Sequence, residues 1–218
     1  QTENFVAQNL ANTIMVKKDS VVTVVDLQNN TSGIFHTSSV QSDKDGPRKS
    51  SVFIPPGTQA QIVKDDGTHV SVNQLTIRIT EATVGPDGEK RMPAELPPRT
   101  AYTWAADFSA DEEQALDSQR IEFSTPLPIY VDNFLNVPVG MAVPIGYLNP
   151  KSGNWEALKD GIVVRSLGAD ANGKVLLDLG SGSAATATEL ASVGITDVEL
   201  LKLSLLYPSG QAFWRGSL

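Results

Sequence analysis

The stretch Leu75-Thr76-Ile77-Arg78-Ile79-Thr80 alternates apolar and polar side chains, so its three apolar residues fall on one face of an extended strand. The stretch Leu127-Pro128-Ile129-Tyr130-Val131 repeats the alternation with turn-forming or more polar neighbours. A strand with one apolar face buries that face against a second sheet. We therefore predict a common sandwich core made of Leu75, Ile77, Ile79, Leu127, Ile129 and Val131.

Turn signals divide the neighbouring sequence into short strands. Asp65-Asp66-Gly67 predicts the turn of a hairpin, and Pro55-Pro56-Gly57 ends the apolar run before it, because proline cannot donate to a strand ladder. The apolar residues change parity between Val72 and Leu75, which predicts a break near Asn73-Gln74. Further strands are predicted at residues 21–25, 51–54, 61–63, 70–72, 121–123, 143–147, 161–167 and 175–179. Short strands at this spacing favour a mainly β protein with an antiparallel β-sandwich.

Helix signals are few and concentrate near the C-terminus. Thr196-Asp197-Val198-Glu199 has the pattern of a capping box, and apolar residues follow it at helical spacing. The stretch 184–193 ends at Gly194, a residue typical of the position just after a helix. Ser109-Ala110-Asp111-Glu112 has the capping-box form and predicts a further short helix. We expect the two C-terminal helices to form a small helical hairpin docked on the β body, because helices this short seldom persist alone.

The charge balance and composition exclude several classes of protein. The 218 residues include 17 Lys and Arg against 25 Asp and Glu, a net charge of -8. Nucleic-acid binding and attachment to an anionic membrane both require clustered basic side chains, so neither is expected. No stretch reaches the roughly 18 apolar residues of a membrane-spanning helix, and we expect no membrane insertion. The absence of cysteine excludes disulfides, thiolate zinc sites and cysteine nucleophiles.

The two histidines, His36 and His69, lack the companions that a catalytic or metal site needs. No nucleophile-elbow sequence provides a serine for a histidine base, and two separated histidines do not make a tetrahedral zinc set. Both are expected to be polar residues at the surface or in turns. We predict no catalytic, cofactor-binding or metal-ligating residue, no cofactor and no enzyme activity. A hydroxyl within hydrogen-bond reach of either ring would favour hydrolysis or self-cleavage instead.

Two acidic turns have oxygen ligands at alternate positions before a glycine, as calcium-binding loops do. They are Asp43 with Asp45 and Asp170 with Asn172. An EF-hand loop supplies a bidentate Glu at its twelfth position, and neither stretch has a carboxylate there. We predict ordinary turns at both places, and the sequence leaves open whether either turn binds calcium weakly.

The tryptophans are too widely separated to indicate a carbohydrate-binding platform. Trp104, Trp155 and Trp214 lie far apart in the chain, and such a platform requires exposed rings side by side. Trp155 follows a turn and is expected to pack across a hairpin from Tyr147.

Three stretches, taken in order, resemble a known family. They are Phe53-Ile54-Pro55-Pro56-Gly57-Thr58, Met92-Pro93-Ala94-Glu95-Leu96-Pro97-Pro98 with Ala101-Tyr102-Thr103, and Phe123-Ser124-Thr125-Pro126-Leu127-Pro128-Ile129-Tyr130-Val131. Together they resemble the ZU5-type β-sandwich. The continuation consists of Val137-Pro138-Val139-Gly140, Gly146-Tyr147, Gly153-Asn154-Trp155, Gly194-Ile195-Thr196-Asp197 and Gln211-Ala212-Phe213-Trp214-Arg215. It resembles the β-rich region preceding the YD repeats of large secreted bacterial RHS-repeat proteins, over about residues 45–215.

The resemblance implies an extracellular or cell-surface protein in which this piece is structural. Its implied partners are the remainder of the parent polypeptide or a surface protein. Some ZU5-linked proteins cleave themselves at a His-Phe-Ser or His-Phe-Thr site, whereas this chain has Phe35-His36-Thr37, in the reverse order and outside the matching region. Self-cleavage is therefore not carried over. Relatives can have an acid-rich, calcium-like turn where this chain has Asp178 alone, so no metal is expected there.

The chain is predicted to divide into four parts. Residues 1–40 form an N-terminal β segment, 41–167 the ZU5-like β-sandwich, and 168–215 a small helical C-terminal segment. Residues 216–218 have the composition of a cloning remnant and are left out of the predicted fold.

Three functions of different classes compete. The leading hypothesis is a non-enzymatic structural or interaction domain of a large exported bacterial RHS-type protein. The second is a carbohydrate- or surface-binding module, which exposed adjacent aromatic rings would favour. The third is an autoprocessing domain or hydrolase, which a hydroxyl beside His36 or His69 would favour.

Overall fold

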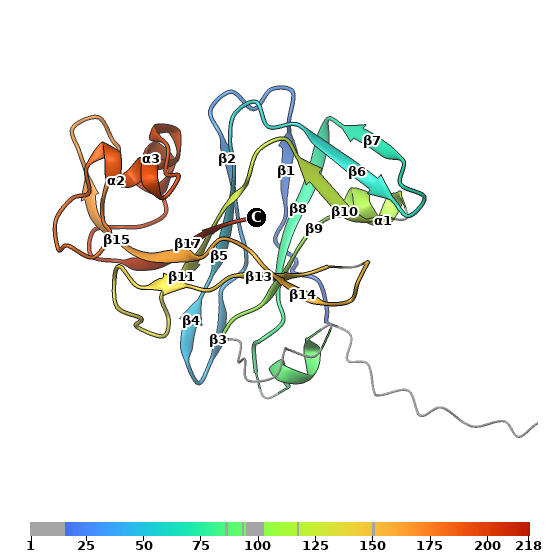
Figure 1. Ribbon diagram of the computed structural model, residues 1–218, viewed down its shortest axis with the longest axis horizontal. Helices are drawn as coiled ribbons and strands as arrows, with labels where there is room; N and C mark the ends of the chain where they lie inside the picture. The colour runs from blue at the N-terminus through green and yellow to red at the C-terminus, as the bar shows by residue number, and fades with distance from the viewer. Residues whose placement is uncertain (1–15, 86, 93, 95–102, 117, 150) are drawn as a thin grey trace, which may run out of the picture.

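The computed structural model describes residues 16–85, 87–92, 94, 103–116, 118–149 and 151–218. Within these residues the chain is mainly β, with antiparallel strands in several sheets and three short α-helices (Figure 1). This architecture is sandwich-like and confirms the predicted fold class.

The largest sheet has seven strands and extends through the middle of the molecule (Figure 1). Its order is β12 (Ala142–Val143), β15 (Gly161–Ala169), β17 (Ala212–Ser217), β11 (Pro128–Asp132), β5 (Ser50–Ile54) and β2 (Ile34–Thr37), with β16 (Val175–Asp178) also paired to β15. The last strand of the chain, β17, thus lies between β15 and β11. Gly216 and Ser217, which the sequence prediction left out, pair with Ile129 and Pro128 and complete this strand.

Two three-stranded sheets and two hairpins make up the rest of the β structure. One sheet has the order β1 (Thr23–Asp26), β8 (Gln74–Glu81) and β9 (Ala106–Ala110), and the other β10 (Ser118–Phe123), β6 (Ala60–Lys64) and β7 (His69–Val72). The hairpins are β3 (Gln41–Asp43) with β4 (Gly46–Arg48) and β13 (Gly146–Leu148) with β14 (Trp155–Ala157). The chain changes sheets between β7 and β8, where the change of parity predicts a break.

The strand predicted at residues 143–147 is instead two strands, β12 and β13, in different sheets. Pro144 lies between them and has no amide proton, so a continuous ladder is interrupted there. Trp155 pairs with Leu148, and Tyr147 lies opposite Glu156, so the predicted Tyr147–Trp155 pairing is one residue out of register.

One apolar cluster lies between the large sheet and the two smaller sheets. Its buried members are Val25, Leu27, Val52, Ile54, Ala60, Leu75, Ile77, Ile79, Ala110, Leu127 and Ile129. Five of the six predicted core residues are therefore confirmed. The sixth, Val131, packs with Val163 and Trp214 in a separate cluster. At that end of β11 the covering residues come from the segment after the strand, including Phe134 and Val137, instead of from the smaller sheets.

A second apolar cluster lies on the other face of the large sheet. Its buried members are Phe53, Tyr130, Val164, Val175, Leu177, Ile195, Leu200, Leu203, Tyr207 and Phe213. Two helices contribute to it, α2 (Ala187–Ser192) and α3 (Asp197–Leu203), which lie together at one end of the molecule (Figure 1). The large sheet is therefore buried on both faces.

Local signals specify the ends of these two helices. The hydroxyl of Thr196 accepts a hydrogen bond from the Glu199 amide at 3.3 Å, as the capping box predicts. Thr186 and Glu189 form the same arrangement at the start of α2. Gly194 has a φ of +73°, which confirms its role in ending α2, since this conformation is strained for other residues.

The predicted N-terminus of the remaining helix is wrong by one residue. Ser109 lies in β9, where it pairs with Arg78, and α1 (Asp111–Ala115) begins after Ala110. The strand ladder keeps Ser109 extended, so its hydroxyl does not cap the helix. Glu113 instead accepts a hydrogen bond from the Ala110 amide at 2.8 Å. A short 3-10 helix, η1 (Gly88–Arg91), precedes β9.

The docking of α3 predicts slow amide hydrogen exchange in a helix that would be unstable alone. Leu200 and Leu203 are buried, with exposed fractions of 6% and 0%. We expect the amide of Leu203 to exchange as slowly as that of Ile77 in β8, because both are released only when the core opens. Exchange of Leu203 at random-coil rates, measured by NMR, would contradict docking.

Candidate functional site

His36 is buried between two sheets, so its predicted position at the surface or in a turn is wrong. It lies in β2 with an exposed fraction of 0%, and its Nδ1 lies 3.0 Å from Thr23 Oγ1. The reason is its place in β2, which pairs with β5 and packs against β1 and β8. His69, by contrast, is exposed on β7, as predicted, with its Nδ1 3.6 Å from Glu122 Oε2.

The contact between His36 and Thr23 supplies the hydroxyl that would favour hydrolysis, but the rest of a catalytic triad does not accompany it. In a triad an acid holds the second imidazole nitrogen and so orients the base. His36 Nε2 is buried and has no hydrogen-bond partner among the described residues. The His36 ring is also fully buried, so a substrate carbonyl cannot reach Thr23 Oγ1 from the side of the ring.

Burial of His36 predicts loss of stability in weak acid. Burial lowers the pKa of His36 below its ordinary value of 6.5, partly opposed by Asp19. The unfolded chain therefore binds a proton that the folded chain excludes, and the free energy of unfolding falls as the pH drops below about 6.5, by at most about 1.4 kcal/mol per pH unit. Denaturant unfolding at pH 7.5, 6.5 and 5.5 measures this effect. His36→Gln should flatten the dependence in that range, and an equally steep dependence in the variant would contradict the assignment.

A second cluster of buried polar side chains is centred on Arg48. The Arg48 side chain is 2% exposed; its Nε donates to Glu81 Oε1 at 2.7 Å, and its two terminal nitrogens donate to the Asp43 carboxylate at 2.8 and 2.9 Å. The guanidinium also lies 4.3 Å from the centre of the Phe134 ring. The hydrogen bonds from Arg48 hold the pKa of Asp43 well below its usual range. These contacts join the β3–β4 hairpin to the end of β8.

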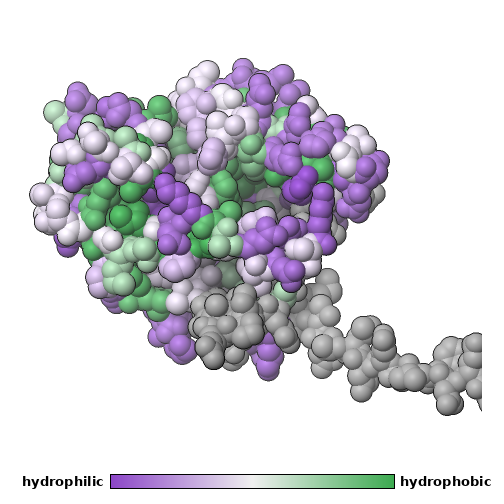
Figure 2. All heavy atoms as spheres, in the orientation of Figure 1, coloured by the Kyte–Doolittle hydropathy of each residue, from purple (hydrophilic) through white to green (hydrophobic). Residues whose placement is uncertain are grey.

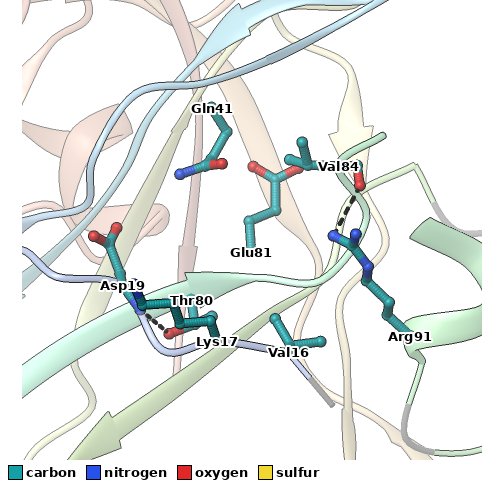
Figure 3. Close-up of a pocket in the computed structure, with 8 residues that line it drawn as sticks. All are labelled: Val16, Lys17, Asp19, Gln41, Thr80, Glu81, Val84 and Arg91. Carbon is teal, nitrogen blue, oxygen red and sulfur yellow. Dashed lines mark hydrogen bonds between the residues drawn. The ribbon is translucent and has the colours of Figure 1, made fainter. Parts of the chain in front are cut away.

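A cavity of about 330 Å³ lies beside this cluster, between the segment before β1, β3 and the end of β8 (Figure 3). The Glu81 carboxylate lies toward Gln41 (Figure 3), and the Gln41 amide donates to the Ser39 hydroxyl at 2.7 Å. Asp19 is already engaged by the amide and hydroxyl of Ser39 at 2.7 and 2.8 Å. Arg91 donates to the Val84 carbonyl at 3.2 Å. Among the charged residues of the lining, Glu81 pairs with Arg48, whereas Asp19 and Arg91 bind neutral groups. The Thr80 hydroxyl in the lining accepts from the Asp19 amide and is not hydrogen-bonded to a base among the described residues.

The acidic turns singled out for calcium use their carboxylates within the turn. Asp43 accepts from the Asp45 amide at 3.0 Å as well as from Arg48. Asp170 accepts from the amides of Asn172 and Lys174 at 2.8 and 2.9 Å. Across the described ranges, no three His, Cys, Asp or Glu side chains gather closely enough to hold a metal ion. These contacts agree with turn chemistry at both places.

Asp178 has a structural position that the sequence analysis missed. It is fully buried at the end of β16, where it pairs with Arg165 and accepts from the amides of Gly180 and Gly182 at 2.8 and 2.9 Å. The signal was present in the glycines that follow it, since a carboxylate before a glycine-rich turn commonly binds the turn amides.

The tryptophans do not form an exposed platform. Trp214 is 6% exposed, and its indole nitrogen donates to Asn133 Oδ1 at 2.8 Å. Trp104 and Trp155 are half-buried. The carbohydrate-binding alternative thus gains no support from these three rings and stays a prediction.

Comparison with known proteins adds no relative. No protein-family model, no curated protein and no solved structure matches this chain. Of the motifs that resemble the ZU5 and RHS proteins, Pro93 and residues 95–102 lie outside the described residues. No helix in the described part of the chain is long and apolar enough to cross a membrane.

Proposed function

We propose that this chain is a non-enzymatic structural and interaction domain of a large exported bacterial RHS-type protein. The contact that carries the proposal is the burial of His36 against Thr23, with no acid of the described residues at Nε2, because the best candidate base is thereby used in packing. The assignment to an RHS-type parent, and to the outside of the cell, rests on the motif resemblance alone.

The buried ion pairs support a structural role. Arg48 joins β4 to Asp43 and Glu81, and Arg215 in β17 pairs with Glu199 in α3. The Arg48–Glu81 pair joins β4 to β8, and the Arg215–Glu199 pair joins β17 to α3. Such links favour a rigid unit, because breaking either leaves a charge buried without a partner.

The outer edge of β1 supports an interaction role. Just after β1, the Leu27 amide donates to the Asn73 carbonyl at 2.8 Å. Backbone hydrogen-bonding groups alternate in direction along an antiparallel strand, so those of the odd-numbered residues point toward β8 and those of Val24 point away from it. Val22 and Val24 are 41% and 56% exposed. Unpaired backbone beside apolar side chains is the surface to which an extended strand adds.

The proposal predicts that the chain does not catalyse a reaction. It also predicts that flanking polypeptide covers the β1 edge in the parent protein. The experiment compares this chain alone with the same chain joined to the polypeptide that flanks it in its gene. We expect slower amide exchange at Val24 in the longer protein, and slower exchange should be lost in Val24→Lys but kept in Leu205→Lys, an exposed leucine after α3.

The same samples test the absence of activity. Intact mass should stay unchanged over days, and a panel of ester, glycoside and peptide substrates should show no hydrolysis. Turnover or cleavage that disappears in His36→Gln would contradict the non-enzymatic role, and unchanged exchange at Val24 in the longer protein would contradict the interaction role.

A further inference from the structure

The cavity of about 330 Å³ beside the Arg48 cluster has side chains of both charges in its lining. Asp19 and Glu81 are its acids, and Lys17 and Arg91 are its bases. The surface near it is polar as well, since the tip of the β3–β4 hairpin at the lower edge of Figure 1 is hydrophilic (Figure 2). Sites for small molecules begin at roughly 300 Å³, so the cavity is large enough for a small polar ligand.

Glu81 brings a buried carboxylate to this cavity. Its side chain is 3% exposed, and its Oε1 accepts from Arg48 Nε at 2.7 Å and from the Thr83 hydroxyl at 2.9 Å. Its Oε2 accepts a hydrogen bond from no residue that the structure describes. Each carboxylate oxygen can accept about two hydrogen bonds, so Oε2 is available to a donor in the cavity.

Gln41 in β3 places a second acceptor beside this carboxylate. Its Nε2 donates to the Ser39 hydroxyl at 2.7 Å, which orients the amide and turns Oε1 toward Glu81 (Figure 3). Two acceptor oxygens that face each other suit a group with several donors and a positive charge. An ammonium group has these properties, because it carries N–H donors and no acceptor.

Arg91 in η1 supplies the opposite charge on another side of the cavity. The Val84 carbonyl accepts from one of its terminal nitrogens at 3.2 Å (Figure 3). A guanidinium group carries several N–H donors in one plane, enough to bind a carboxylate as well. The exposed Lys17 adds positive charge to the lining.

This pattern selects a ligand that carries both charges. A simple anion would meet Glu81 and Asp19, and a simple cation would meet Arg91 and Lys17, so each would be repelled by part of the lining. We propose that the cavity binds a small free amino acid, with its ammonium group between Glu81 and Gln41 and its carboxylate against Arg91. This ligand site goes beyond the structural role and does not depend on the RHS-type parent.

The test is NMR titration of the whole chain with L-alanine, and with acetate and methylammonium as probes that carry only one of its charges. We expect saturable shifts of the Gln41, Glu81 and Arg91 amides with L-alanine. Each single-charge probe should bind at least about tenfold more weakly, because it makes only half of the contacts. Absence of saturable binding by L-alanine would overturn the proposal. Equal affinity for acetate or methylammonium would overturn it too, since either result identifies a site for one charge.

Two variants assign the contacts without disturbing the Arg48–Glu81 pair. Arg91→Met should lower the affinity for L-alanine about tenfold, as expected for loss of a charged hydrogen bond, and Gln41→Leu should lower it several-fold without a change of charge. Lys90→Met is the matched control, because Lys90 lies in the same helix η1, pairs with Asp87 at 3.0 Å and is not among the described residues of the lining. It should leave affinity unchanged. Equal affinities in Arg91→Met and Lys90→Met would overturn the proposed contact with the carboxylate, and unchanged affinity in Gln41→Leu the proposed place of the ammonium group.

Discussion

Replacing Glu199 with leucine is expected to lower the free energy of unfolding by about 3–5 kcal/mol, because Arg215 then keeps a buried charge without a counter-ion. Glu199 Oε1 accepts from Arg215 Nε at 2.8 Å and from the Tyr130 hydroxyl at 2.7 Å. Burial raises the pKa of Tyr130 well above its ordinary value, so the phenol stays a donor. The Glu199 and Arg215 side chains are only 1% and 7% exposed, so water does not replace the lost partner.

Arg215 also binds carbonyls at the C-terminus of α2, so the Arg215–Glu199 pair links β17, α3 and α2. Its two terminal nitrogens donate to the carbonyls of Val193 and Gly194, both at 2.9 Å. These carbonyls lie at the C-terminus of α2 and have few other partners. Loss of the Glu199 carboxylate should therefore loosen α2 as well as α3.

Denaturant unfolding and hydrogen exchange measure this effect. The double variant Glu199→Leu with Arg215→Met should recover part of the lost stability, since no charge is then left buried. Asp197→Asn serves as the control, because Asp197 is an exposed acid in the same helix. A loss below about 1 kcal/mol in Glu199→Leu would contradict a buried pair, since that is the range of surface salt bridges.

Ile77→Asp is expected to abolish cooperative unfolding. Ile77 is 6% exposed in β8, the central strand of its sheet, and belongs to the cluster that joins this sheet to the large sheet. The substitution removes apolar contacts and buries a carboxylate with no cation beside it, a change that costs several kcal/mol. A small domain commonly has only about 5–15 kcal/mol of stability.

Val24→Asp is the matched control, because Val24 lies in the neighbouring strand β1 and is 56% exposed. We expect it to change the free energy of unfolding by less than about 1 kcal/mol. Thermal melting followed by near-ultraviolet circular dichroism distinguishes the two variants. A wild-type melting curve for Ile77→Asp would remove β8 from the core.

The parts of the fold that depend on local pattern could be predicted. The alternation over residues 75–80 identifies the inward face of β8, and the turn at Asp65-Asp66-Gly67 identifies the β6–β7 hairpin. The capping box at Thr196 gives the start of α3. The same pattern at Ser109 misleads, because pairing with Arg78 keeps that residue in a strand.

The candidate site could be predicted only in part. The exposed position of His69 and the turn roles of Asp43 and Asp170 follow from their neighbours in sequence. Burial of His36 does not, because its neighbours Ile34, Phe35 and Thr37 in β2 do not reveal that β1 covers it. The ring's environment is set by Thr23, a residue of another strand.

The amino-acid sequence predicts that this protein is mainly β, where most of its strands and turns lie, and where its two C-terminal helices end. These properties depend on the periodicity of apolar residues and on turn and cap residues, which act over a few positions. The position of β17 between β15 and β11 and the contact of Glu199 with Arg215 arise from packing in three dimensions and could not be predicted from local pattern. The Ser109 hydroxyl is likewise left buried without a hydrogen-bond partner in the part of the chain that the structure describes. Strand order and buried polar contacts join residues distant in the chain, and their energies depend on burial that local sequence does not specify.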